Sequence, residues 1–176
     1  MCVIGSGFGR LAALGLAFVG LVGAHEPLPS FESRVLASHN LERARLGFPN
    51  LHWNAELARN AQAWAEHLAR TGRFEHSPNL PGEAPEGENI WGGTSGYYQP
   101  EDMVKLWIDE RDNFVPGTFP RNSSTGRIAD VSHYTQLIWP RTTQVGCALA
   151  KGASEDILVC HYSEPGNVIG SNALAT

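Results

Sequence analysis

The chain is poor in cysteine and has no long run of one charge. Its 176 residues include 3 cysteines, and 13 lysines and arginines stand against 18 aspartates and glutamates, for a formal net charge of -5. Three cysteines are too few for a scaffold held together by many disulfides, because such scaffolds need several pairs. The basic residues are scattered along the chain, so no basic run favours a nucleic-acid backbone as a partner.

Long apolar runs are also scarce. The longest one, over residues 11–22, is shorter than the roughly 20 residues that a membrane span needs. Arg10 precedes it and the small residues Gly23 and Ala24 follow it, which predicts a secretory signal peptide; an uncleaved signal anchor is the alternative. The expected organisation is a signal peptide over 1–24, a short segment over 25–30 and one domain over 31–176. We therefore expect a secreted protein, extracellular or periplasmic, that meets a membrane only through its signal peptide.

Removal of the signal peptide would leave two cysteines, Cys147 and Cys160, in an oxidising setting. The flanking segments VGCALAK and DILVCHY alternate like strands, and the four residues 152–155 between them predict a hairpin loop. Pairing Lys151 with Asp156 sets Cys147 opposite Cys160, at a separation that a disulfide can bridge. The alternative is a pair of free thiols.

Periodicity predicts helices in the first part of the domain and strands in the last. Helices are expected over 31–46, over 54–71 between an Asn54 cap and a Gly72 stop, and from Pro100 onward. Residues 73–99 and 115–130 are predicted as loops because they are rich in turn-forming residues. Strands are expected over 133–139, 145–151 and 157–163. This order indicates an α+β domain with helices packed on an antiparallel sheet.

Several polar residues fall against apolar elements. Glu110 lies on the stripe of the third helix, where an unpaired carboxylate would be costly. His133 opens the apolar run SHYTQLIW, and three roles are open for it: a surface residue, a hydrogen-bonded core residue or a ligand at the mouth of a site. In the first helix, His39, Asn40 and Arg43 share one face, and we interpret them as a buried structural network.

Four segments, HNLER, GENIW, SHYTQLIWPRTTQVGCA and ILVCHYSEPGNVIG, follow one another along the chain. Together they resemble the motif set of the CAP superfamily, which comprises cysteine-rich secretory proteins, antigen 5 and plant pathogenesis-related proteins of the first class. The resemblance covers about residues 31–169. It implies a three-layer α-β-α sandwich with a central, mainly antiparallel sheet.

The resemblance also implies a cleft lined by two histidines and two glutamates. The matching residues are His76 in EHSPN, Glu88 in GEN, Glu110 in WIDE and His133 at the start of its motif. Neutral imidazoles suit Zn²⁺, while carboxylates complete its shell or orient the rings. A divalent cation, Zn²⁺ or Mg²⁺, held by His76 and His133 is therefore one interpretation, and a metal-free hydrogen-bonded network of the four residues is the other.

Three functions follow as alternatives. The first is a binding protein for a divalent metal, with a lipid, sterol or protein as a further ligand. The second is a metal-assisted hydrolase or glycosidase-like enzyme with Glu88 and Glu110 as catalytic candidates. The third is a structural or host-interaction module. No nucleophile–base pair is recognisable, which favours binding over catalysis.

The loop WGGTSGYY, over residues 91–98, is the candidate surface for a lipid or sterol. It loosely resembles the segment linked to sterol binding in the CAP superfamily. The alternative is that Trp91 packs onto the core and the two tyrosines are ordinary surface residues.

Overall fold

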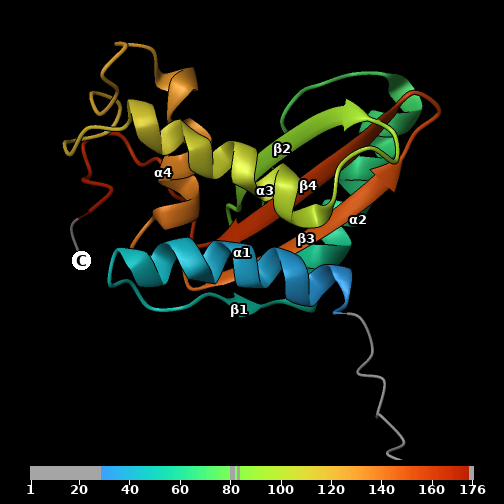
Figure 1. Cartoon of the computed structure of the whole chain (residues 1–176), viewed down its shortest axis with the longest axis horizontal. Helices are drawn as coiled ribbons and strands as arrows, with labels where there is room; N and C mark the ends of the chain where they lie inside the picture. Colours follow the sequence, from blue (N-terminus) through green and yellow to red (C-terminus); the bar gives the residue numbers. More distant parts are fainter. Residues whose placement is uncertain (1–28, 80–81, 83, 175–176) are drawn as a thin grey trace, which may run out of the picture.

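The computed structural model describes residues 29–79, 82 and 84–174, so the predicted signal peptide lies outside the described residues. The helices are α1 (Phe31–Arg45), α2 (Ala55–Thr71), α3 (Pro100–Asp109) and α4 (Ser132–Ile138), and the strands are β1 (His52–Trp53), β2 (Gly87–Thr94), β3 (Gln144–Lys151) and β4 (Glu155–Ser163) (Figure 1). None of the helices in the described part of the chain is long and apolar enough to cross a membrane.

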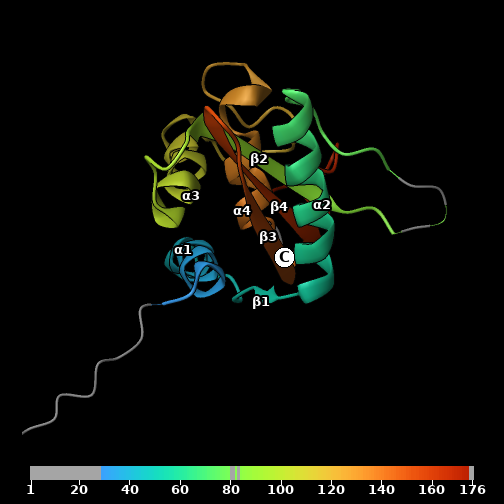
Figure 2. The same ribbon diagram turned by 90° about the vertical axis from the view of Figure 1, so that its right-hand side faces the viewer.

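The strands form one sheet in the order β1-β3-β4-β2. The pairs β2–β4 and β3–β4 are antiparallel, whereas the short β1 runs parallel to β3. Figure 2 shows α2 against one face of the sheet and α1 and α3 on the other side. The three-layer α-β-α sandwich with a mainly antiparallel sheet is therefore confirmed.

The hairpin of β3 and β4 has the predicted register. Lys151 pairs with Asp156 and Cys147 pairs with Cys160. The two cysteines form a disulfide, with their Cα atoms 4.0 Å apart. The hairpin and the disulfide are therefore confirmed. In a hairpin the turn type and the loop length fix which residues of the two strands face one another.

The first two helices lie where their periodicity and caps place them. In α2, the side-chain oxygen of Asn54 accepts hydrogen bonds from the amides of Glu56 and Leu57, and Gly72 ends the helix with a left-handed φ of 66°. The helix packs closely on β3, since a Cβ on Gly146 would collide with main-chain atoms of Asn54 and Ala58. Glycine at this position thus sets the spacing between α2 and the sheet.

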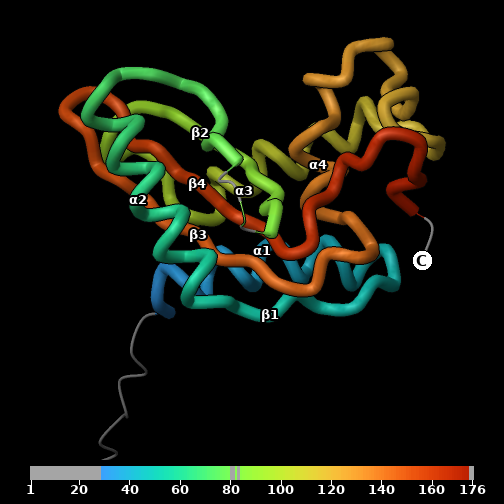
Figure 3. The backbone as a smooth tube through the Cα atoms, turned by 180° about the vertical axis from the view of Figure 1, so that it is seen from behind, coloured from blue at the N-terminus to red at the C-terminus, as the bar shows by residue number. Residues whose placement is uncertain are grey.

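The prediction of a strand over residues 133–139 is wrong. Ser132–Ile138 form α4, and the five residues from Tyr134 to Ile138 are all buried. A short, continuous apolar run does not distinguish a buried strand from a buried helix, because neither periodicity is visible when every face is covered. The chain after β4 passes beside this helix, where Asn167 hydrogen-bonds Ser132 and Thr135 (Figure 3).

The prediction of a loop over residues 73–99 is wrong for its central part. Gly87–Thr94 form β2, which pairs with β4 over its full length. Glycine is unfavourable in strands and misleads a local prediction. Here the glycines leave room for side chains that pack close to the strand. A Cβ on Gly87 would collide with the side chain of Gln136, and a Cβ on Gly93 would collide with that of Trp91.

Candidate functional site

Glu88 lies near the start of β2, opposite His161 of β4. One of its carboxylate oxygens accepts from Nδ1 of His76 at 2.5 Å and from the amide of Ser77 at 3.0 Å. The other accepts from Nε2 of His161 at 2.9 Å. The side chain of Glu88 is 7% exposed, whereas that of His76 is 69% exposed. Glu88 is therefore a buried anchor that holds an exposed imidazole.

Glu110 follows the last residue of α3 and holds the second predicted histidine. One carboxylate oxygen accepts from Nδ1 of His133 at 2.5 Å. The other accepts from the backbone amides of His133 and Tyr134 at 2.9 and 3.0 Å, in the first turn of α4. The ring of Trp107 stacks on the ring of His133 with an interplanar angle of 14°. His133 is therefore partly buried and held on several sides, and the simple surface role is excluded.

The four residues predicted as the site form two histidine–glutamate pairs, His76 with Glu88 and His133 with Glu110. In both pairs Nδ1 donates to a carboxylate, so that Nε2 is the atom left with a lone pair. Among the residues that the structure describes, neither Nε2 makes a hydrogen bond. Both carboxylates also accept hydrogen bonds at their second oxygen, so their contacts fix the orientation of the two rings.

The protonation of Glu88 follows from its contacts. Burial by itself would raise its pKa, but hydrogen bonds from His161, His76 and the Ser77 amide outweigh burial and lower the pKa to about 2. The hydrogen bond to Glu88 raises the pKa of His76, against the opposing effect of burial. Glu88 is therefore ionised at neutral pH and does not supply the proton that a glycosidase-like mechanism needs from its general acid.

The chemistry of each histidine is that of a metal ligand. Within the described ranges, no group of three or more histidine, cysteine, aspartate or glutamate residues is arranged to hold a metal ion by itself, so a closed four-ligand site is not formed by these residues. A histidine that binds metal usually donates its other ring N–H to a carboxylate. His76 and His133 both have this arrangement, and water would complete the coordination.

Two further residues of this region were not predicted from the sequence. His161 is almost fully buried, and its Nδ1 contacts Glu86 at 2.5 Å while its Nε2 contacts Glu88. The alternation of DILVCHY does mark His161 as polar in an apolar strand. The sequence does not identify its partners, because the glycines of β2 favour a loop.

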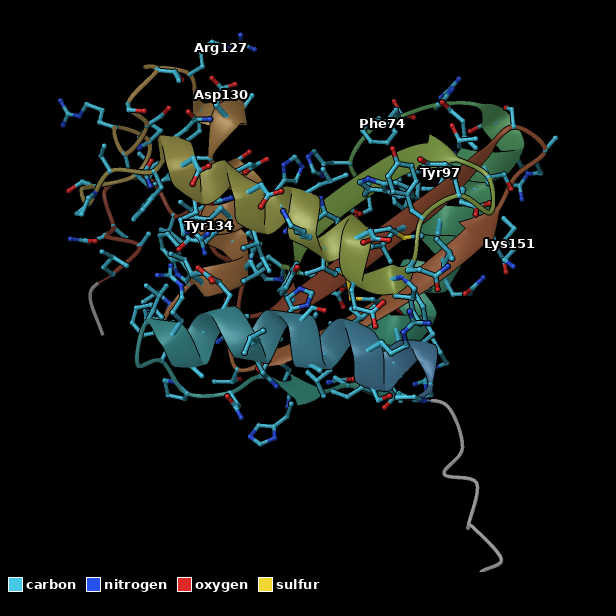
Figure 4. All side chains as sticks on the ribbon, viewed as in Figure 1. Phe74, Tyr97, Arg127, Asp130, Tyr134 and Lys151 are labelled. Atoms are coloured by element: carbon cyan, nitrogen blue, oxygen red, sulfur yellow. A yellow bond between two sulfur atoms is a disulfide. The ribbon has the colours of Figure 1, made fainter. Side chains whose placement is uncertain are left out.

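Residues 91–98, of which 91–94 belong to β2, are divided between core and surface. Trp91 is buried and makes an edge-to-face contact with Tyr98 at 5.0 Å. Tyr97 is 74% exposed and Phe74 is 64% exposed, and both lie toward the same end of the molecule (Figure 4). The structure thus packs Trp91 onto the core, and it leaves two large aromatic side chains at the surface.

Sequence comparison connects the chain with known proteins. The model of the cysteine-rich secretory protein family, CAP, matches residues 36–162. A pathogenesis-related protein PR-1 of Medicago truncatula is 33% identical over 144 residues, which are 80% of this chain and 78% of that protein. A probable pathogenesis-related protein of Candida albicans is 34% identical over 147 residues. These residues make up 81% of this chain but 40% of the Candida protein, so the chain spans less than half of that relative.

Solved structures with the same fold have lower sequence identity. The crystal structure of NaASP2 with Zn²⁺ has a TM-score of 0.65 and 20% identity, over 81% of this chain and 83% of that one. The structure of BmVAL-1 has a TM-score of 0.63 and 23% identity, over 86% of this chain and 84% of that one. At these identities the two structures support the fold alone.

Proposed function

We propose that this chain, which belongs to the CAP family of cysteine-rich secretory proteins, is an exported protein that binds a divalent metal ion through Nε2 of His76 and Nε2 of His133. The observation that carries the proposal is that both rings are held at Nδ1 by a buried or partly buried carboxylate, Glu88 or Glu110. A bound cation would supply a positive charge and open coordination positions at the protein surface. The zinc in the NaASP2 crystals is consistent with such a role.

Binding is better supported than hydrolysis by the same contacts. A carboxylate that activates water must lie within hydrogen-bond reach of that water and take its proton. Both oxygens of Glu88 and both oxygens of Glu110 already accept hydrogen bonds from the protein. Glu88, with a pKa of about 2, is also a weak base. We therefore assign the two glutamates to the orientation of the histidines.

Zinc binding is the direct test of the proposal. The double variant His76→Ala, His133→Ala is expected to lose the zinc that the wild-type protein retains after dialysis, because both ligands are gone. Zinc should raise the stability of the wild type by about 2.7 kcal/mol at a hundredfold excess over Kd and leave the variant unchanged. Elemental analysis and thermal unfolding measure the two effects. The matched control is His52→Ala, because His52 is exposed; equal zinc contents in all three proteins would rule the site out.

A lipid or sterol is the second candidate ligand, and the exposed Phe74 and Tyr97 favour it. Exposed aromatic side chains of this size contribute apolar area when a protein meets a lipid. The variant Phe74→Ser, Tyr97→Ser is expected to lose binding to phosphatidylcholine vesicles that contain cholesterol, as measured by co-sedimentation. Leu41→Ser removes an equally exposed apolar side chain from α1 and should bind as the wild type does. Equal sedimentation of all three proteins would exclude this surface.

A further inference from the structure

The two glutamates of the site are held in different ways. Both use one oxygen to accept from a histidine Nδ1, and the second oxygen needs another donor to fix the carboxylate in place. For Glu110 these donors are two backbone amides at the start of α4, those of His133 and Tyr134. For Glu88 the nearer donor is a side chain, Nε2 of His161 at 2.9 Å, and the amide of Ser77 reaches the same oxygen only at 3.4 Å.

His161 is in turn fixed by groups on the α2 side of the sheet. Its Nδ1 contacts Glu86 at 2.5 Å, and the other oxygen of Glu86 accepts from the side-chain amide of Asn60, on α2, at 2.8 Å. The His161 side chain is 5% exposed and that of Glu86 is 27% exposed. Asn60, Glu86, His161, Glu88 and His76 thus form one continuous hydrogen-bond chain.

The inner part of this chain has little freedom to rearrange. Glu88 and His161 face each other on paired strands, and ionised carboxylates only accept hydrogen bonds. His161 therefore keeps an ionised Glu88 in place only by donating from Nε2. The outer end of the hydrogen-bond chain, at Glu86, is more accessible to solvent. Glu86 lines a pocket of about 490 Å³ together with Trp64 and His67.

We infer that His161 is a positioning residue for the metal-binding imidazole of His76 and that it acts through Glu88, with Glu86 and Asn60 fixing its own ring. This inference rests on the proposed metal function. His161 does for Glu88 what the backbone amides of α4 do for Glu110. The loss of a carboxylate or other group that orients a ligating histidine typically lowers metal affinity 10- to 100-fold.

The test compares His161→Leu, which removes the donor, with His161→Gln, whose side-chain amide can donate to Glu88. Zinc affinity, measured by competition with a chromophoric chelator, is expected to fall about tenfold in His161→Leu, the lower end of that range because His161 acts through Glu88, and to recover in part in His161→Gln. In the metal-free protein, ¹⁵N NMR of the imidazoles reports the tautomers. His76 should lose its preference for the Nδ1–H form in His161→Leu, while His133 should keep it and serves as the internal control.

The two readouts separate the possible failures. If zinc does not bind to the wild-type protein, the proposed function is wrong, and the tautomer of His76 still decides the role of His161. Zinc affinity within twofold of wild type together with an unchanged His76 tautomer would overturn the inference. A change of equal size at His133 would also overturn it, because the effect would then be a general loosening of the fold. If His161→Leu does not fold, Glu86→Ala removes the outer anchor and is judged by the same measurements.

Discussion

Arg43→Met is expected to lower the free energy of unfolding by about 4 kcal/mol or more, the largest change predicted for a single substitution in this domain. The guanidinium of Arg43 is fully buried and donates to the carbonyl oxygens of Pro49, Leu137, Trp139 and Thr142 at 2.8 to 3.1 Å. A buried polar group left without a partner costs about 1–3 kcal/mol. Methionine fills much of the volume but leaves all four carbonyls without their donor.

The charge on Arg43 persists despite its burial. Burial lowers its pKa to about 10, which leaves it protonated at neutral pH. Its donors join α1 to the end of α4 and to the segment after it, so their loss should loosen the helix that carries His133. The polar face predicted for residues 31–46 is thus a structural network, as expected.

Urea denaturation at neutral pH measures the effect of Arg43→Met. Arg43→Lys should be intermediate, since an ammonium has three donors but not the planar geometry of a guanidinium. Arg34→Met is the matched control on the same helix, because Arg34 pairs with Glu101, whose side chain is 47% exposed; its loss should cost far less, since exposed ion pairs contribute little. Equal midpoints for Arg43→Met and Arg34→Met would contradict the prediction.

The second large effect is a loss of stability in mild acid that originates at His39. This residue is fully buried, with Nδ1 at 2.9 Å from the carbonyl oxygen of Val35 and Nε2 at 2.8 Å from the hydroxyl of Tyr162. Burial lowers its pKa from 6.5 to about 4, and the positive charge of Arg43 acts in the same direction, against the hydrogen bond to Val35. The folded state therefore holds His39 neutral where the unfolded chain already binds a proton.

The direction in which stability changes with pH follows from this difference in proton binding. Between pH 6.5 and about 4 the unfolded state binds more protons at His39 than the folded state does, so stability falls as the pH falls. The shift corresponds to a loss of about 3 kcal/mol across this window. His76 acts in the opposite direction, since its raised pKa adds stability at low pH that is lost as the pH rises. The contribution of His39 must therefore be taken from a comparison of variants.

His39→Gln isolates that contribution, because glutamine does not titrate. The variant is expected to be less stable than the wild type at pH 7. The free energy of unfolding of the wild type, relative to that of the variant, should fall by about 3 kcal/mol between pH 7 and pH 4. Urea denaturation across this range provides the curves. His52→Gln replaces an exposed histidine, and its curve should run parallel to that of the wild type. A His39→Gln curve parallel to the wild-type curve would show that the acid effect comes from other groups.

Local sequence patterns predict the elements that are specified by residues close to them in the sequence. The caps Asn54 and Gly72 delimit α2, and the alternation on both sides of a four-residue loop led to the register that joins Cys147 to Cys160. The four site residues follow from the family resemblance, and in the structure they form two histidine–glutamate pairs. Periodicity by itself marks only Glu110 and His133.

Local patterns fail for the two elements whose surroundings are formed by residues distant in the sequence, β2 and α4. Strand β2 looks like a loop because of its glycines, yet the side chains of Gln136 and Trp91 occupy the space beside them. Helix α4 looks like a strand because it is covered on all sides. The carboxylate of Glu110, 23 positions before His133, accepts hydrogen bonds from the amides of its first turn. Local periodicity does not indicate such a contact.

The sequence by itself indicated the family, the sandwich architecture, the disulfide and the four candidate site residues, since these follow from ordered motifs and from a short hairpin. Only the tertiary structure decided which atoms of the histidines are available and what holds the glutamates. The physical reason is that Glu88 meets His161, 73 residues later in the chain, through the pairing of β2 with β4. No local pattern specifies that pairing before the sheet has formed.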